Sequence, residues 1–241
     1  MSITILLIII ITSVIQSFFG VGILLFGTPL LLLMGNEFLE ALLILLPLSI
    51  AINSFQIIKD YSFIDISFYK NVLIFTIPLI MAFLFISITT NINIVFFVGV
   101  FLIFVSLKNY FSLLNRILEF VGRFQKTYLI IMGILHGLTN LGGSLLTAIV
   151  YSKEKQKEIT RATIATCYAT FGVFQVITLI IIDKNNIIFF KNNIYYMLIG
   201  ISIYFIIEKF VYSKINNQKY SVMFSGFMLI TGLLLIIKVY V

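Results

Sequence analysis

The sequence predicts an all-α, polytopic membrane protein made of two inverted repeats, each with one broken re-entrant helical hairpin and three transmembrane helices. Three observations lead to this prediction. The chain of 241 residues is 61% hydrophobic and only 10% charged. Apolar blocks that are long enough to cross a bilayer recur along its whole length. One long broken block followed by three plain blocks occurs twice, which is typical of an internal repeat.

The first repeat is expected to cover residues 1–121. Its hairpin is predicted over 3–34, because glutamine, serine and glycine interrupt the apolar run near 16–22. At about 1.5 Å per residue, each arm would rise roughly 20 Å, which is short of the ~30 Å hydrocarbon core. The chain is therefore expected to turn back inside the membrane. The transmembrane helices that follow are predicted over 38–58, 71–88 and 93–113.

The second repeat is expected to cover residues 122–241, with a hairpin over 127–151 that is broken near 136–143. Its transmembrane helices are predicted over 162–182, 192–207 and 220–240. Two short matches support the duplication and occur in the same order. "GILL" (Gly22–Leu25) aligns with "GSLL" (Gly143–Leu146), and "SFQII" (Ser54–Ile58) aligns with "VFQVI" (Val173–Ile177).

The distribution of Lys and Arg favours a re-entrant second break. If that break returns to its own side, one face carries 13 of the 16 Lys and Arg residues, whereas nine and seven result if every block crosses once. Short basic loops tend to stay in the cytoplasm, so the charges indicate topology and not a nucleic-acid partner. The charges do not decide whether the first break is re-entrant, because residues 35–37 contain no Lys or Arg. Only the internal repeat extends the re-entrant interpretation to the first break. We then expect a multi-pass protein of the plasma membrane with both termini outside the cytoplasm.

The two breaks are the predicted substrate site. A turn at membrane depth leaves backbone groups without helical partners, and it survives only inside protein or beside a watery cavity. The second arm of each hairpin would point bare N–H groups and the positive end of its dipole at the midplane, which favours a bound anion without a buried Lys or Arg. The residues expected to bind substrate are Gln16, Ser17, Gly20, Gly22, Asn53, Gln56, His136, Thr139, Asn140, Gly142, Gly143, Ser144 and Gln175.

Other chemistry is poorly represented. One cysteine excludes an intramolecular disulfide, and no ligand cluster predicts a metal site or another cofactor. The predicted spans lack central charged residues, and no nucleophile has both a base and an orienting acid, so an enzyme is not expected. His136, the sole histidine, is expected either to satisfy an orphan carbonyl or to take up a proton during transport. Coupling to H⁺ or to Na⁺ is open at this level.

The breaks resemble those of the TauE/SafE family of sulfite and organosulfonate exporters. The resemblance lies in "FFGVGILLFGTPLLLLMG" (Phe18–Gly35) and "GILHGLTNLGGSLL" (Gly133–Leu146), within a duplicated four-block organisation that covers essentially the whole chain. It implies a secondary transporter of small sulfur-containing or carboxylate anions, often acting in export.

Three functional readings are compatible with these patterns. The first is a transporter, and on the family pattern an exporter, of small anions such as sulfite, sulfonates or related organic acids. The second is a transporter of a neutral or weakly basic solute, in which Gln, Asn and Ser supply hydrogen bonds. The third is a non-transport accessory protein whose breaks are kinks in fully crossing helices and whose glycines only pack against neighbours.

Overall fold

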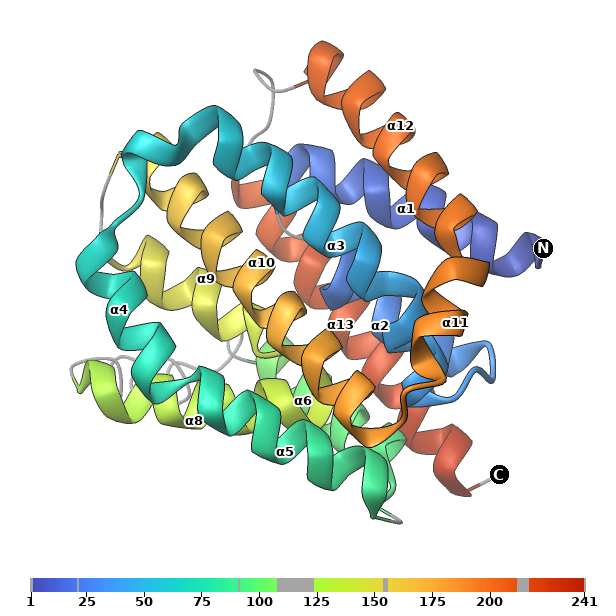
Figure 1. The fold of residues 1–241 in the computed structure, drawn as a ribbon. Coiled ribbons are helices and arrows are strands. Elements are labelled where there is room, and N and C mark those ends of the chain that lie inside the picture. Colours follow the sequence, from blue (N-terminus) through green and yellow to red (C-terminus); the bar gives the residue numbers. More distant parts are fainter. Residues whose placement is uncertain are drawn as a thin grey trace.

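The computed structural model describes residues 2–20, 22–90, 92–107, 124–153, 156–211 and 217–240. Every regular element in these residues is helical, which confirms the predicted all-α class. The elements, drawn in Figure 1, are α1 (Ile3–Phe19), α2 (Ile23–Leu33), α3 (Phe38–Asp60), η1 (Tyr61–Phe63), α4 (Ile66–Phe75), α5 (Ile77–Thr89), α6 (Ile94–Leu107), α8 (Gln125–Thr139), α9 (Gly143–Tyr151), α10 (Lys157–Ile182), α11 (Asn186–Asn192), α12 (Ile194–Val211) and α13 (Asn217–Tyr240).

The predicted breaks fall where the structure interrupts its helices, between α1 and α2 and between α8 and α9. Other boundaries differ. The span predicted over 71–88 begins at Ile66 and is divided at Thr76, two residues before Pro78 in the first turn of α5. α10 begins at Lys157, five residues before the predicted start. The end of the span predicted over 93–113 lies outside the described residues.

Three described helical stretches are long and apolar enough to cross a bilayer: Phe38–Phe63, Ile66–Thr89 and Glu158–Ile182. A fourth results if α11 and α12, bent by 50° relative to each other, count as one span. Four shorter apolar helical stretches among the described residues have 10–17 residues: Ile3–Ser17, Ile23–Leu33, Ile94–Leu107 and Ser225–Tyr240. The expected number of six membrane-crossing helices therefore stays a prediction.

The exterior is apolar, as a lipid environment requires. On α1, Ile3, Leu7 and Ile11 lie one turn apart and are exposed, whereas Thr12 and Ser13 are fully buried. Polar side chains of a membrane helix face the bundle interior, where they find partners. Thr12 accordingly donates to the carbonyl of Ile8 at 2.7 Å.

The helices of the two halves pack in matching pairs. α3 packs against α10, and α6 packs against α13. α5 packs against the first arm of the second hairpin, α8, while α12 packs against the first arm of the first hairpin, α1. Figure 1 shows α3 and α10 crossing the middle of the molecule side by side, with both chain ends on the right.

The second hairpin folds back on itself. Tyr128, in the first turn of α8, donates from its hydroxyl to the Leu145 carbonyl in α9 at 2.8 Å. Lys153, just beyond α9, donates to the Gln125 side chain at the start of α8 at 2.9 Å. These two hydrogen bonds hold the start of α8 close to α9 and to the residues that follow it.

Two ends of the molecule can be distinguished. At one end of the molecule, the start of α1 and the end of α2 contact α12 and α13. The Ser2 amide donates there to the Tyr196 hydroxyl of α12, and Lys238 of α13 donates to the Leu32 and Leu33 carbonyls. We call this the α2–α3 end. At the opposite end, the Asp65 backbone amide donates to the Thr163 hydroxyl at 2.9 Å. We call this the α3–α4 end.

Candidate functional site

The second break is shaped by Asn140. This residue has φ +61°, the single positive φ among the described residues other than glycine, and its amide donates to the His136 carbonyl at 2.8 Å. Asn tolerates this left-handed conformation better than most residues. α8 thus ends at Thr139, and α9 begins at Gly143, after three intervening residues.

The Asn140 side chain joins three helices from both halves of the chain. Its amide nitrogen donates to the Thr28 hydroxyl of α2 at 2.9 Å, and its oxygen accepts from the Gln175 side chain of α10 at 3.1 Å. All three side chains are at most 1% exposed. Thr28 was not among the predicted site residues, although the Thr28-Pro29 pair marks an irregular position in α2.

His136 lies beside these groups and is fully buried. Its ring centroid is 4.8 Å from that of Phe171 on α10. Gln175 interacts with the imidazole, but no hydrogen bond of normal geometry reaches either ring nitrogen within the described part of the chain. A buried polar group without a hydrogen bond costs free energy, so a polar ligand that bonds to either nitrogen would be favoured. We call Thr28, His136, Asn140 and Gln175 the Asn140 cluster.

The first break is held by Gln16. Its side-chain nitrogen donates to the Gly20 carbonyl at 2.9 Å, and its oxygen accepts from the Ile23 amide at 3.2 Å. Gly20 has φ +71°, which favours glycine. Gly22 is needed for close approach, because a Cβ there would lie 2.9 Å from the Gln16 backbone nitrogen. Gln16 therefore closes the turn instead of lining a cavity.

We expect Gln16→Leu to lower the free energy of unfolding by about 1–3 kcal/mol, because two buried hydrogen bonds across the break are lost. Thermal labelling of Cys167 measures this effect, since that residue is the sole cysteine and is fully buried. Gln156→Leu is the control, because Gln156 is exposed and its side chain makes no cap bond. Equal labelling temperatures for the two variants would contradict the assigned role.

The breaks supply fewer bare amides than the sequence predicts. In the second break the Leu141 amide donates to the Thr139 hydroxyl, and the Ser144 and Leu145 amides donate to the Leu141 and Gly142 carbonyls. In the first break, Ile23 donates to Gln16 and Phe26 donates to the Gly22 carbonyl. Several donors at these helix starts are therefore used within the turn itself.

Several predicted residues serve the turns or the packing. The hydroxyls of Ser17, Thr139 and Ser144 donate to the Val14, Leu135 and Leu141 carbonyls. Gly142 and Gly143 allow close contact, since a Cβ at Gly142 would lie 2.5 Å from His136 Cβ and one at Gly143 would lie 1.6 Å from the Tyr168 hydroxyl.

The predicted pair on α3 is not joined to Asn140 by a hydrogen bond. Asn53 donates to the Ser49 carbonyl at 2.7 Å, one turn earlier on the same helix. Gln56 donates to the Tyr204 hydroxyl of α12 at 2.8 Å. Gln56 and Gln175 occupy aligned positions in the two predicted repeats, yet they bind different partners.

The structure adds charged residues that sequence reasoning missed. Arg161 forms an ion pair with Glu208 and donates to the Tyr204 hydroxyl at 3.1 Å. The Arg161 side chain is only 11% exposed, so a partly buried cation, which the predicted site did not include, lies beside Gly20 of the first break. The misplaced start of α10 hid it, because residue 161 was assigned to a loop. The sequence held one signal for this network, because Tyr204 and Glu208 are one helical turn apart and therefore lie on the same face of a helix.

No group of three or more His, Cys, Asp or Glu residues is placed to hold a metal ion in the part of the chain that the structure describes. The fold and the Asn140 cluster define an integral membrane protein with interrupted helices and polar groups in its core, an arrangement typical of secondary transporters. The family model of the sulfite exporter TauE/SafE matches residues 5–235. The chain belongs to this family, whose members are membrane transporters and not enzymes.

The match confirms the resemblance drawn from the glycine-rich breaks. No curated protein and no solved structure matched the chain.

Proposed function

We propose that the protein is a secondary transporter that exports small anions, such as sulfite, sulfonates or related organic acids, and binds them at the Asn140 cluster. Asn140 carries the proposal, because it is a break residue that connects the other hairpin and α10 through buried hydrogen bonds. A substrate that enters this cluster contacts both halves of the chain at once. Relative movement of the halves would then expose it to either side of the membrane.

The helix pairing supports two inverted repeats. The counterparts in the two repeats are α1 and α8, α3 and α10, α5 and α12, and α6 and α13. If each helix is exchanged for its counterpart, the packed pairs α3–α10 and α6–α13 stay the same, and the pair α5–α8 becomes the pair α12–α1, which also packs together. The first hairpin reaches inward from the α2–α3 end, whereas the outer ends of the second lie at the α3–α4 end (Figure 1). Two hairpins entering from opposite ends are the arrangement that an inverted repeat requires.

The α3–α4 end faces the cytoplasm in this proposal. Lys59, Lys153 and Arg161 lie at this end, and the loops expected there carry 13 of the 16 Lys and Arg residues. Cytoplasmic loops are enriched in these residues. Both termini then face outside the cytoplasm, and the protein resides in the plasma membrane.

Uptake into proteoliposomes tests the proposed function. We expect labelled sulfite or sulfoacetate to accumulate, with lactate and taurine measured alongside to define the substrate class. Liposomes without protein are the control. Accumulation no greater than in these liposomes, for all four compounds and with either an H⁺ or a Na⁺ gradient, would contradict transport of anions.

His136 is the proposed proton acceptor during transport. Its ring nitrogens lack hydrogen-bond partners within the described chain, and the imidazole lies beside Gln175, which binds Asn140. A proton on His136 would offset the charge of an anion in the same cluster.

We expect His136→Gln to flatten the pH dependence of uptake and to lower its rate roughly tenfold or more. Gln keeps a hydrogen-bonding side chain but cannot gain a charge. The measurement is the initial uptake rate between pH 5.5 and 8. An unchanged rate with an unchanged pH profile would show that His136 takes up no proton in transport.

One observation favours the second reading, in which the transported solute is neutral or weakly basic and supplies N–H or O–H donors. The side-chain oxygens of Asn53, Gln56 and Gln175 are buried and accept no hydrogen bond within the described residues. A fully deprotonated anion cannot supply the missing donors. Uptake of a neutral amide or a weakly basic amine by a protein that takes up neither sulfite nor methanesulfonate would support this reading.

A further inference from the structure

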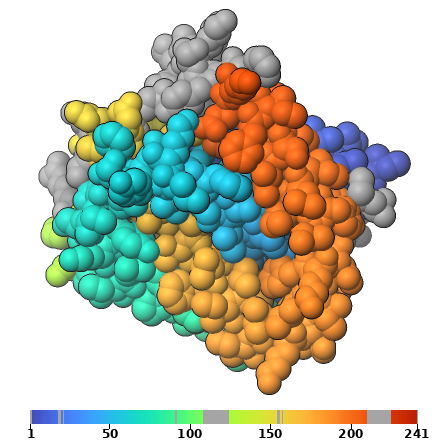
Figure 2. Space-filling model, turned by 45° about the horizontal axis from the view of Figure 1, so that its top comes forward, coloured from blue at the N-terminus to red at the C-terminus, as the bar shows by residue number. Residues whose placement is uncertain are grey.

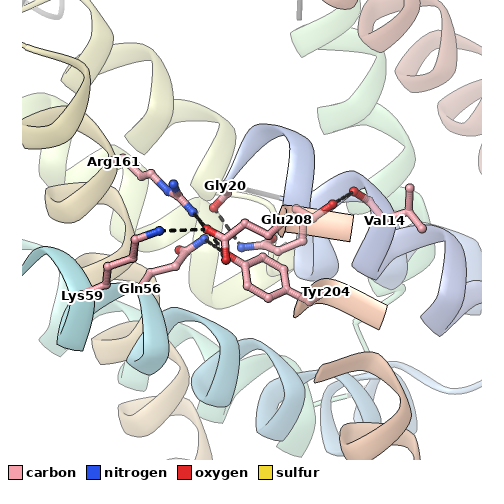
Figure 3. A network of polar contacts seen from close by, with 9 residues as sticks. Val14, Gly20, Gln56, Lys59, Arg161, Tyr204 and Glu208 are labelled. Carbon is pink, nitrogen blue, oxygen red and sulfur yellow. Dashed lines mark hydrogen bonds and ion pairs between the residues drawn. The ribbon is translucent and has the colours of Figure 1, made fainter. Parts of the chain in front are cut away.

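Charged and polar side chains join α3, α10 and α12 at the α3–α4 end of the molecule. Glu208 of α12 forms ion pairs with Arg161 of α10 and, at 3.9 Å, with Lys59 of α3. Tyr204, one turn before Glu208, accepts hydrogen bonds from Arg161 and Gln56. Figure 3 shows both cations pointing at the Glu208 carboxylate from different helices. We call these five residues the Glu208 cluster.

The central ion pair is largely shielded from water. The side chains of Arg161 and Glu208 are 11% and 14% exposed, whereas Lys59 is 65% exposed. Desolvation offsets much of the attraction within such a pair, so a buried pair is weak evidence of a purely stabilising role. Two cations, from α3 and α10, face this one carboxylate. A monoanion that takes the place of the carboxylate would meet both of them.

The position of the cluster connects it to the proposed site. A Cβ on Gly20, at the first break, would lie 4.0 Å from Arg161 Cγ, and Figure 3 shows Gly20 beside the network. Arg161 and Gln175 both lie on α10. The 14 residues between positions 161 and 175 correspond to about 21 Å along the helix. One helix therefore leads from the Glu208 cluster to the Asn140 cluster.

We propose that the Glu208 cluster is a second anion-binding site, where Arg161 binds an oxyanion such as a sulfonate or hydrogen sulfite after the anion displaces the Glu208 carboxylate. This inference rests on the proposed anion transport. The planar guanidinium binds a sulfonate through two parallel hydrogen bonds, as it binds a carboxylate. Glu208 is thus an internal competitor that occupies the position of the substrate oxyanion.

Displacement of Glu208 releases α12 from its neighbours. The carboxylate connects α12 to α10 through Arg161 and to α3 through Lys59. Figure 2 shows α12 (orange) lying over the surface of α3 (blue to cyan), so its movement would uncover this part of the bundle. Binding of an anion is therefore coupled to opening at the α3–α4 end.

A single tryptophan reports this change, because the chain has none of its own. Phe205 of α12 lies with its ring centroid 5.0 Å from that of Phe55 on α3, so Phe205→Trp senses the contact between these helices. The purified reporter protein is titrated with sodium methanesulfonate or sodium sulfite at constant ionic strength. We expect a saturable change in emission.

Three substitutions in the reporter protein test the assignment. Glu208→Gln removes the competitor and is expected to lower the half-saturating concentration roughly tenfold. Arg161→Gln is expected to abolish the response. Arg161→Lys keeps the charge without the planar fork and is expected to weaken binding, which provides a reading if Arg161→Gln fails to fold. Glu158→Gln is the matched control, since it removes the same charge from an exposed position one turn from Arg161.

Equal half-saturation in Glu208→Gln and Glu158→Gln would overturn the proposal, as would a saturable response in folded Arg161→Gln or none in the parent protein. Uptake measurements separate this proposal from the proposed function. Uptake that Arg161→Gln leaves unaltered overturns the second site and leaves transport intact. Saturable binding by a parent protein that transports no anion supports the site and contradicts transport.

Discussion

Asn140→Gly is expected to lower the rate of anion uptake at least about a hundredfold while the protein stays folded. Glycine adopts the φ of +61° found at this position, so the substitution removes the side chain without straining the turn. Thr28 and Gln175 then lose their shared partner. Displacement of site groups by even 1 Å costs a comparable factor in other proteins. Initial uptake rates per folded protein provide the measurement.

Asn71→Ala is the control for this variant, because the Asn71 side chain makes only an exposed bond to the Ser67 carbonyl on α4. We expect its uptake to match that of the parent. A double-mutant cycle with Thr28→Val measures the coupling directly. Uptake by Asn140→Gly at the parental rate, or additive effects in the cycle, would remove Asn140 from the site.

Gly137→Ala is expected to lower the free energy of unfolding by about 1–3 kcal/mol, which is the usual cost of overpacking. A Cβ at Gly137 would lie 2.8 Å from the Ile80 carbonyl oxygen and 2.8 Å from Phe83 Cβ. Backbone atoms of α5 cannot move aside as a flexible side chain does, so α8 and α5 must separate. The temperature at which Cys167 becomes reactive provides the measurement.

Gly226→Ala is the matched control, because within the described part of the chain no atom beyond its own stretch of α13 lies within 4 Å of the position that its Cβ would occupy. Alanine is favoured over glycine within a helix by about 0.5–1 kcal/mol, so this variant is expected to be as stable as the parent or slightly more stable. If Gly137→Ala labels at the same temperature as Gly226→Ala, the tight α5–α8 contact is not a source of stability.

Local composition predicted where the helices are interrupted. Glycines with neighbouring polar residues placed the breaks near 16–22 and 136–143, and the helices are interrupted around Gly20–Gly22 and Asn140–Gly142. Helix starts were predicted less well. Lys157–Arg161 is charged and was assigned to a loop, yet it forms the first turns of α10. Charge density does not prevent helix formation when the charges lie at the end of a span.

Side-chain roles at the breaks depended on geometry that composition does not contain. Gln16 and Asn140 are both polar residues at a break, but Gln16 closes its own turn and Asn140 reaches across to α2 and α10. Gln56 and Gln175 likewise align in sequence and differ in partner. Such differences arise because the partners lie on helices that are far away along the chain.

The sequence by itself determined that this is a helical membrane protein of the TauE/SafE family, since mean composition, block length and glycine positions are local properties of the chain. Tertiary structure alone decided which buried polar groups meet. It paired Asn140 with Thr28, and Arg161 with Glu208, across 112 and 47 residues of chain. In a low-dielectric interior these groups must find partners, and the packing of the helices selects which partners are within reach.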